Sequence, residues 1–171
     1  MLPLKSFVMP HGDHPGTFGH VRKHDIHTGI DLYTVKDADV FAIECGEIVK
    51  IDYFTGAKAG SPWWYETCAI MVEGKSGVIN YGEIQPHARV GHRPLLGSKI
   101  EEGYCLGRVV PVLPPEKLRP DIPGHSCSML HIELYEHGCR EFAIWELGKP
   151  KPNGLLDPTQ LLHDLFIHAH G

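Results

Sequence analysis

Short runs of aliphatic and β-branched residues recur along the chain and predict a mainly β protein. Glycines or polar residues separate the runs, as turns separate strands, and the runs span residues 30–33, 40–43, 47–51, 68–72, 78–81 and 128–135. The polar segment 73–77 predicts a hairpin with a connection of about five residues. Glycines in segment 97–110 stand where tight turns or bulges are needed. We therefore expect a compact, mostly antiparallel β-sheet or sandwich-like domain.

The N-terminus and one internal segment differ from this pattern. Residues 1–25 are rich in Gly, Pro and His without periodicity, which predicts an N-terminal arm. Prolines between residues 110 and 126 exclude regular structure and predict a loop, and loops of this length often form the rim or lid of a site. No segment has the composition of a linker, so we expect one domain over residues 1–171. Its β core is expected at 26–137 and its C-terminal extension at 138–171.

The extension is expected to carry a helix at about residues 158–167. Asp157 is suited to the N-cap and Pro158 to the first helical position. Apolar residues then recur at helical spacing: Leu161, Leu162, Leu165 and Phe166.

The overall composition excludes several classes of function. The formal net charge is −5 and no basic stripe is present, which argues against nucleic acid as the main partner. No run approaches the ~18 apolar residues of a membrane span, and the first residues lack the pattern of a signal peptide. The five cysteines are never spaced C-x-x-C, which is typical of reduced thiols. We therefore expect a cytoplasmic protein, unless a further segment precedes this sequence.

Two segments far apart in the sequence carry residue types that bind zinc. His27 and Asp31 lie four positions apart before and within the first predicted strand, and His131 lies within the strand predicted at 128–135. Two imidazoles and one carboxylate are the ligand set of a zinc (Zn²⁺) site that leaves one position open for water. The H-x-x-x-D spacing alone fits a surface histidine beside a capping aspartate equally well.

Five segments together resemble the lysostaphin-type (LytM-like) zinc metallopeptidases. They correspond to the family's H-x-G-x-D segment, following strand pair, Tyr-x-His strand, glycine-framed turn and closing His-x-His segment, and they lie here at residues 26–32, 39–49, 78–83, 97–107 and 129–133. The resemblance implies a β-sheet groove in which His27, Asp31 and His131 hold zinc. It also implies a peptide or amide substrate, since family members generally cut peptide bonds in bacterial cell-wall cross-links.

The sequence departs from the family at two positions that the resemblance assigns to catalysis. Glu83 stands where the family has the histidine of Tyr-x-His, and Met129 stands where it has the first histidine of the closing pair. In the family these histidines activate the water and stabilise the developing negative charge. Glu83 is a candidate general base, because a carboxylate beside a zinc-bound water can accept its proton, or it is an ordinary solvated acid. Met129 cannot donate a hydrogen bond, and His125 is the candidate replacement.

Two further features bear on the site. Glu133 shares a strand face with His131, so it either orients the imidazole or forms a structural salt bridge. The aromatic loop 63–65 (Trp63, Trp64 and Tyr65) either walls a groove or caps the sheet.

Two functions remain open from the sequence. The first is a zinc-binding, lysostaphin-type metallopeptidase-like protein, with altered or weak peptidase or amide hydrolase activity. The second is a non-catalytic zinc-containing module that binds a protein or peptide in the groove.

Overall fold

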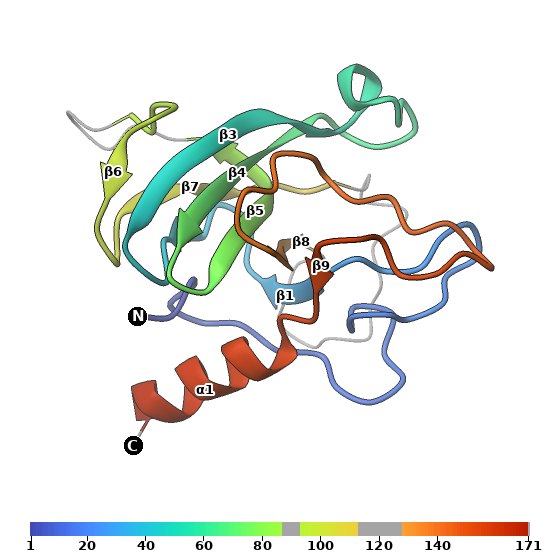
Figure 1. Ribbon diagram of the computed structural model, residues 1–171, viewed down its shortest axis with the longest axis horizontal. Helices are drawn as coiled ribbons and strands as arrows, with labels where there is room; N and C mark the ends of the chain where they lie inside the picture. Colours follow the sequence, from blue (N-terminus) through green and yellow to red (C-terminus); the bar gives the residue numbers. More distant parts are fainter. Residues whose placement is uncertain (87–92, 113–127, 171) are drawn as a thin grey trace.

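The core of the protein is one antiparallel sheet, which has nine strands in the part of the chain that the structure describes (Figure 1). The computed structural model describes residues 1–86, 93–112 and 128–170. The strands are β1 (Ile30–Thr34), β2 (Asp39–Phe41), β3 (Gly46–Thr55), β4 (Thr67–Gly74), β5 (Gly77–Pro86), β6 (Lys99–Ile100), β7 (Cys105–Val109), β8 (Ser128–Tyr135) and β9 (Leu155–Leu156). The helices are the short 3-10 turn η1 (Ala57–Ala59) and α1 (Thr159–His170). The prediction of a mainly antiparallel β fold with a C-terminal helix is confirmed.

The strand order is β1-β8-β5-β4-β3-β6, with β2 paired to β7 and β7 paired to β5. Strands β1 and β8 come from distant parts of the sequence, yet they are neighbours, and Asp31 lies directly opposite His131 in their register. Strand β5 pairs with the other edge of β8, where Gly82 lies opposite His131. The sheet therefore places the late histidine between the first strand and the centre of the fold.

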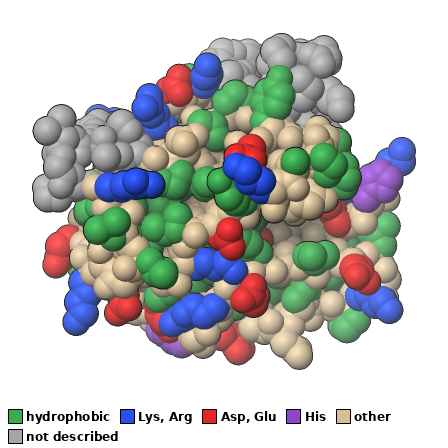
Figure 2. Space-filling view, turned by 90° about the horizontal axis from the view of Figure 1, so that it is seen from above, with side chains coloured by type: hydrophobic (Ala, Val, Ile, Leu, Met, Phe, Trp, Pro, Cys, Tyr) green, Lys and Arg blue, Asp and Glu red, His purple; other side chains and the backbone are tan. Residues whose placement is uncertain are grey.

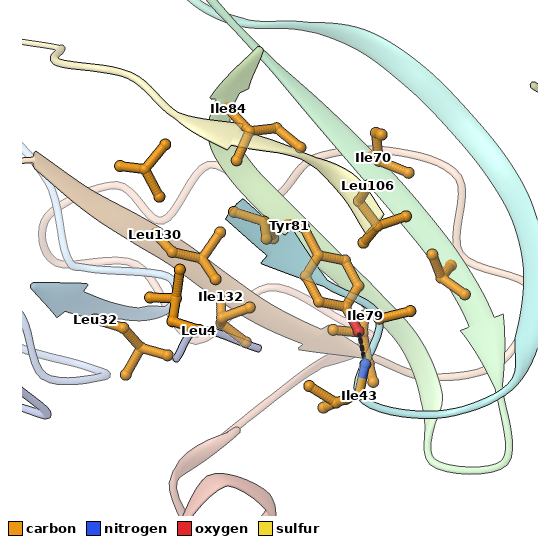
Figure 3. Close-up of a cluster of buried hydrophobic side chains, with 14 of the residues drawn as sticks. Leu4, Leu32, Ile43, Ile70, Ile79, Tyr81, Ile84, Leu106, Leu130 and Ile132 are labelled. Atoms are coloured by element: carbon orange, nitrogen blue, oxygen red, sulfur yellow. Dashed lines mark hydrogen bonds between the residues drawn. The ribbon is translucent and has the colours of Figure 1, made fainter. Parts of the chain in front are cut away.

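Strand β8 separates the apolar core from a polar face because successive side chains of a strand point to opposite sides. Leu130 and Ile132 are fully buried in the core, where they pack with apolar side chains from β1, β4, β5 and β7 (Figure 3). Tyr81 lies in the same cluster, and its hydroxyl accepts a hydrogen bond from the backbone N–H of Ile43 at 3.0 Å. The alternate residues of β8, which include His131, face the other side of the strand.

Strand β5 changes partner at Glu83. Residues 78–82 pair with β8 and residues 84–86 pair with β7. Towards β4, Gly82 and Glu83 together oppose Ala69 alone, which is a β-bulge, and Glu83 adopts a left-handed φ of 63°. Bulges bend a strand and re-aim a side chain, and they are frequent next to active sites.

Two predicted boundaries differ from the structure. Gly74 pairs with Gly77, so the hairpin connection is shorter than the predicted five residues. The carboxylate of Glu44 stabilises this tight turn by accepting hydrogen bonds from the backbone N–H and hydroxyl of Ser76.

Helix α1 begins one residue later than predicted and extends further towards the C-terminus. Asp157 accepts a hydrogen bond from the backbone N–H of Thr159 at 2.8 Å, as expected of a residue that caps a helix. Leu162 is buried, whereas Phe166 is 44% exposed and forms a T-shaped ring contact with Phe7. No helix in the described ranges has the length and apolar character needed to cross a membrane.

Acidic and basic side chains are interspersed over the face shown in Figure 2, with apolar side chains between them.

Candidate metal centre

Folding brings His27, Asp31 and His131 into one buried cluster. His27 Nε2 lies 3.1 Å from His131 Nδ1 and 3.1 Å from Asp31 Oδ1, and His131 Nδ1 lies 2.9 Å from Asp31 Oδ1. Each of the three residues is at most 5% exposed. The ligand atoms that the sequence analysis singled out therefore face one another, and they are placed to hold a metal ion.

Each of the three side chains has a partner on the side that faces away from the cluster. His27 Nδ1 lies 2.9 Å from the carbonyl oxygen of Thr17, and Arg22 Nη2 donates to Asp31 Oδ2 at 2.9 Å. His131 Nε2 lies 3.2 Å from Glu133 Oε1, which is an ion-pair distance, although the two atoms do not form a hydrogen bond of regular geometry. If the outer ring nitrogens carry the protons, the inner lone pairs point into the cluster. Such outer partners typically orient the ligands of metal sites.

The geometry fits a tetrahedral ion. Ligand atoms at 2.0–2.2 Å from zinc are separated by about 3.3–3.6 Å when the site is tetrahedral. The three separations here are 2.9–3.1 Å, so a small outward movement of the side chains accommodates the ion. The donor set of two imidazoles and one carboxylate also matches sites that leave a fourth position open.

The electrostatics of the cluster favour a positive charge at its centre. Burial raises the pKa of Asp31, but the neighbouring His27 and His131 outweigh it and hold that pKa well below its usual range. Burial lowers the pKa of His131, but the Asp31 and Glu133 carboxylates outweigh it and raise that pKa to about 10. Without a metal, a proton on His131 therefore supplies the positive charge that two nearby carboxylates require.

Gly29 of the H-x-G-x-D segment allows β1 to approach His131. A Cβ atom at this position would clash with the carbonyl oxygen of Ile132 and would lie 2.8 Å from His131 Nε2. Both contacts are with groups that the sheet or the cluster holds in place.

We expect Gly29→Ala to weaken zinc binding and to lower the free energy of unfolding by about 1–3 kcal/mol, the usual cost of overpacking. Urea denaturation would measure the free energy of unfolding, and competition with a chelator would measure the zinc affinity. If both stay at wild-type values, the close approach at this position is not required.

Glu83 is buried beside the cluster and is not the solvated acid that the sequence left as an alternative. It is 7% exposed, and its Oε2 has no hydrogen-bond partner among the described residues. Burial, followed by the negative charge of Asp31, raises its pKa to about 8. An unpaired carboxylate oxygen at this depth is costly, and such groups often mark a functional site.

An open cleft of about 500 Å³ leads to the cluster. Its floor includes His27, His131 and Glu83, and Arg22 also lines it. One wall comes from β3 and the loop after it, and the other from segment 141–145.

Aromatic side chains shape this cleft. The Phe54 ring lies 5.4 Å from the His131 ring and 5.1 Å from the Phe142 ring, measured between centroids, so it bridges the centre and the far wall. Of the predicted aromatic loop, Trp64 lines the cleft, whereas Trp63 is 64% exposed. The loop therefore contributes one aromatic side chain to the cleft and does not cap the sheet with Trp63.

Of the two other residues that the sequence singled out, Met129 and His125, the structure describes one. Met129 lies on the same face of β8 as His131 and is half-buried, but it does not line the cleft. His125 lies outside the described residues. Arg22 was missed, because it lies in an arm without periodicity and nothing in its spacing to Asp31 signals a contact.

Comparisons with known proteins add the fold type. No model of a protein family matches the sequence, and no curated protein matches it either. Among solved structures, the catalytic domain of the peptidase lysostaphin from Staphylococcus simulans is similar, with 14% identity, a TM-score of 0.52 and 92% of each chain covered. A mutant catalytic domain of the prophage-encoded protein EnpA from Enterococcus faecalis shows 19% identity, a TM-score of 0.50 and 91% coverage of each chain.

A solution structure of lysostaphin matches with 13% identity and a TM-score of 0.53, covering 93% of this chain and 51% of that one. The chain thus spans about half of that lysostaphin chain. These similarities show that the protein has the lysostaphin-type peptidase fold, as the sequence motifs indicated.

Proposed function

We propose that this protein is a zinc-dependent hydrolase of peptide or amide bonds in which Glu83 acts as the general base. The observation that supports this most directly is the mutual approach of His27, Asp31 and His131, of which the two histidines line an open cleft. When bound, zinc would polarise a substrate carbonyl and make a coordinated water more acidic.

Glu83 is suited to accept a proton at this site. It lines the same cleft as His27 and His131, and the bulge in β5 directs its carboxylate away from the regular ladder. A general base works best when its pKa is near the working pH, and burial raises the pKa of Glu83 towards that range. The Glu83 carboxylate would therefore activate the water, a role that a histidine has in the lysostaphin-type family.

Arg22 is suited to hold negative charge that develops on the substrate. Its Nη2 bonds to Asp31, and its Nε and Nη2 bond to the carbonyl of Pro15, so the guanidinium is held in place. Its Nη1 has no hydrogen-bond partner within the described part of the chain. A fixed cationic donor in a cleft is a usual means of stabilising an oxyanion, and here it would compensate for Met129.

The alternative is a non-catalytic module that contains zinc and binds a protein or peptide in the cleft. Met129 favours it, because a thioether can neither donate a hydrogen bond nor carry a positive charge.

The two functions are distinguished by measuring metal content and hydrolysis together. Metal analysis of the purified protein is expected to give one zinc per chain, and a mixed peptide library is expected to be cleaved. Cleavage should stop on treatment with a chelator and return with added zinc. Stoichiometric zinc without cleavage would favour the binding module, and absence of zinc binding would contradict both.

A further inference from the structure

A chain of polar contacts connects His131 to the far wall of the cleft. Glu133 Oε1 lies 3.2 Å from His131 Nε2, and Glu133 Oε2 accepts a hydrogen bond from the Tyr135 hydroxyl at 2.7 Å. The same hydroxyl accepts a hydrogen bond from the backbone N–H of Ala143 at 2.9 Å. Ala143 lies in the wall segment 141–145.

All side chains of this relay are buried. Glu133 and Tyr135 are each 1% exposed, and Asn80, which donates to Glu133 Oε2 at 2.7 Å, is fully buried. The carboxyl group of Glu133 lies between His131, Asn80 and Tyr135. A buried carboxylate is costly unless it is paired and hydrogen-bonded. The hydrogen-bonding partners of Glu133 therefore hold its carboxylate in one position.

The strand itself puts these groups in line. Residues 131, 133 and 135 alternate along β8 and share the face opposite the core. The metal ligand, the carboxylate and the hydroxyl thus sit on one rigid element, and only the last contact crosses to the wall.

The wall segment has other anchors: Phe142 packs on Phe54, the backbone N–H of Ile26 donates to the carbonyl of Trp145, and further polar contacts lie at the surface. Lys50 donates to the carbonyl of Arg140 and pairs with Glu141, and Glu73 accepts from the backbone N–H of Gly138 and from Arg140. Exposed pairs of this kind contribute little and are screened by salt. The Tyr135–Ala143 hydrogen bond is the anchor that leads through Glu133 to His131.

We propose that Glu133 and Tyr135 are positioning residues that couple occupation of the metal centre to the order of the cleft wall at Ala143. The coupling rests on the proposed function, since it requires a cation at the His27–Asp31–His131 cluster. A cation bound at Nδ1 of His131 fixes the orientation of the ring, so that Nε2 stays directed at Glu133. Glu133 then holds the Tyr135 hydroxyl with its lone pairs towards Ala143. By linkage, an ordered wall strengthens cation binding by the same factor.

Tyr135→Phe tests the relay, with Tyr81→Phe as the matched control. Both tyrosines are buried and both hydroxyls accept from a backbone N–H, but Tyr81 contacts Ile43 in the core and not the centre. We expect Tyr135→Phe to lower the zinc affinity about 10-fold, in the range seen for outer partners of metal ligands. Competition with a chromophoric chelator measures the affinity. Tyr81→Phe should leave it unchanged.

Hydrogen exchange at the Ala143 amide supplies a second readout that does not depend on activity. In the wild type and in Tyr81→Phe, added zinc is expected to slow this exchange. In Tyr135→Phe the exchange is expected to be faster and to respond no longer to zinc. If Tyr135→Phe is too unstable, Glu133→Gln serves instead, with an expected 10–100-fold loss of zinc affinity.

The outcomes separate this inference from the proposed function. If the wild type binds zinc but Tyr135→Phe matches Tyr81→Phe in affinity and in exchange, the relay is wrong and the metal site stands. If the wild type binds no zinc, the proposed function and the coupling both fail. If added zinc no longer slows exchange at the Ala143 amide in Tyr135→Phe but still slows it in Tyr81→Phe, the relay is supported.

Discussion

Replacing Glu83 with glutamine is expected to lower the kcat of peptide hydrolysis by about 10²–10⁴-fold, the usual contribution of a general base. Glutamine keeps the size of the side chain but cannot accept a proton at neutral pH. Because Glu83 is not one of the three clustered ligand residues, zinc content is expected to stay at the wild-type level. Single-turnover hydrolysis and metal analysis on the same preparation would check both expectations.

The control is Glu44→Gln. Glu44 is also a buried carboxylate, at 5% exposure, but it stabilises the β4–β5 turn through Ser76. This variant should keep full activity at temperatures where it is folded. Activity in Glu83→Gln equal to that of Glu44→Gln would rule out Glu83 as the base.

The pH dependence of the reaction follows from the same residue. Only the deprotonated carboxylate accepts a proton, so the rate should rise with pH through the ionisation of Glu83. Burial and Asp31 raise the pKa of Glu83 to about 8 in the metal-free protein. A bound cation favours the charged form and lowers this pKa, so the rise is expected at or below pH 8. Glu83→Gln should abolish this limb of the profile.

Replacing His131 with alanine is expected to abolish stoichiometric zinc binding. The change leaves only His27 and Asp31, and two ligands are too few for a stable zinc site. Binding to the folded state alone stabilises a protein by about 4 kcal/mol when the free ligand exceeds its Kd 1,000-fold. Zinc should therefore raise the Tm of the wild type by several degrees and leave the Tm of His131→Ala unchanged. Calorimetry with and without a chelator would measure this.

His20→Ala is the control for nonspecific binding by the many histidines of this chain. His20 pairs with Asp13 in the N-terminal arm at 3.1 Å and is not one of the clustered ligands. It should keep both the zinc content and the zinc-induced rise in Tm. A His131→Ala protein that behaves in the same way would show that the metal is bound elsewhere.

Much of the sheet was predictable because strand periodicity is a local property. The strand predicted at 128–135 coincides with β8, since its apolar and polar residues alternate with the two faces of the sheet. The hairpin after β4 was predicted too long, because the Glu44 carboxylate that tightens it comes from a distant segment. Helix α1 was predicted from its N-cap and from the spacing of its apolar residues. The exposure of Phe166 depends instead on which segments pack against the helix.

Some residues of the candidate site were likewise predictable from the sequence, and others were not. The residue types and motif spacing of the sequence were sufficient to single out His27, Asp31 and His131, because zinc ligands belong to a small chemical set. Only the tertiary structure decided that Glu83 is buried, since this depends on the bulge where β5 leaves β8 for β7. The hydrogen bonds of Arg22 with Asp31 and of Tyr135 with Ala143 were likewise visible only in the tertiary structure. These contacts join segments through packing, for which a linear sequence carries no periodic signal.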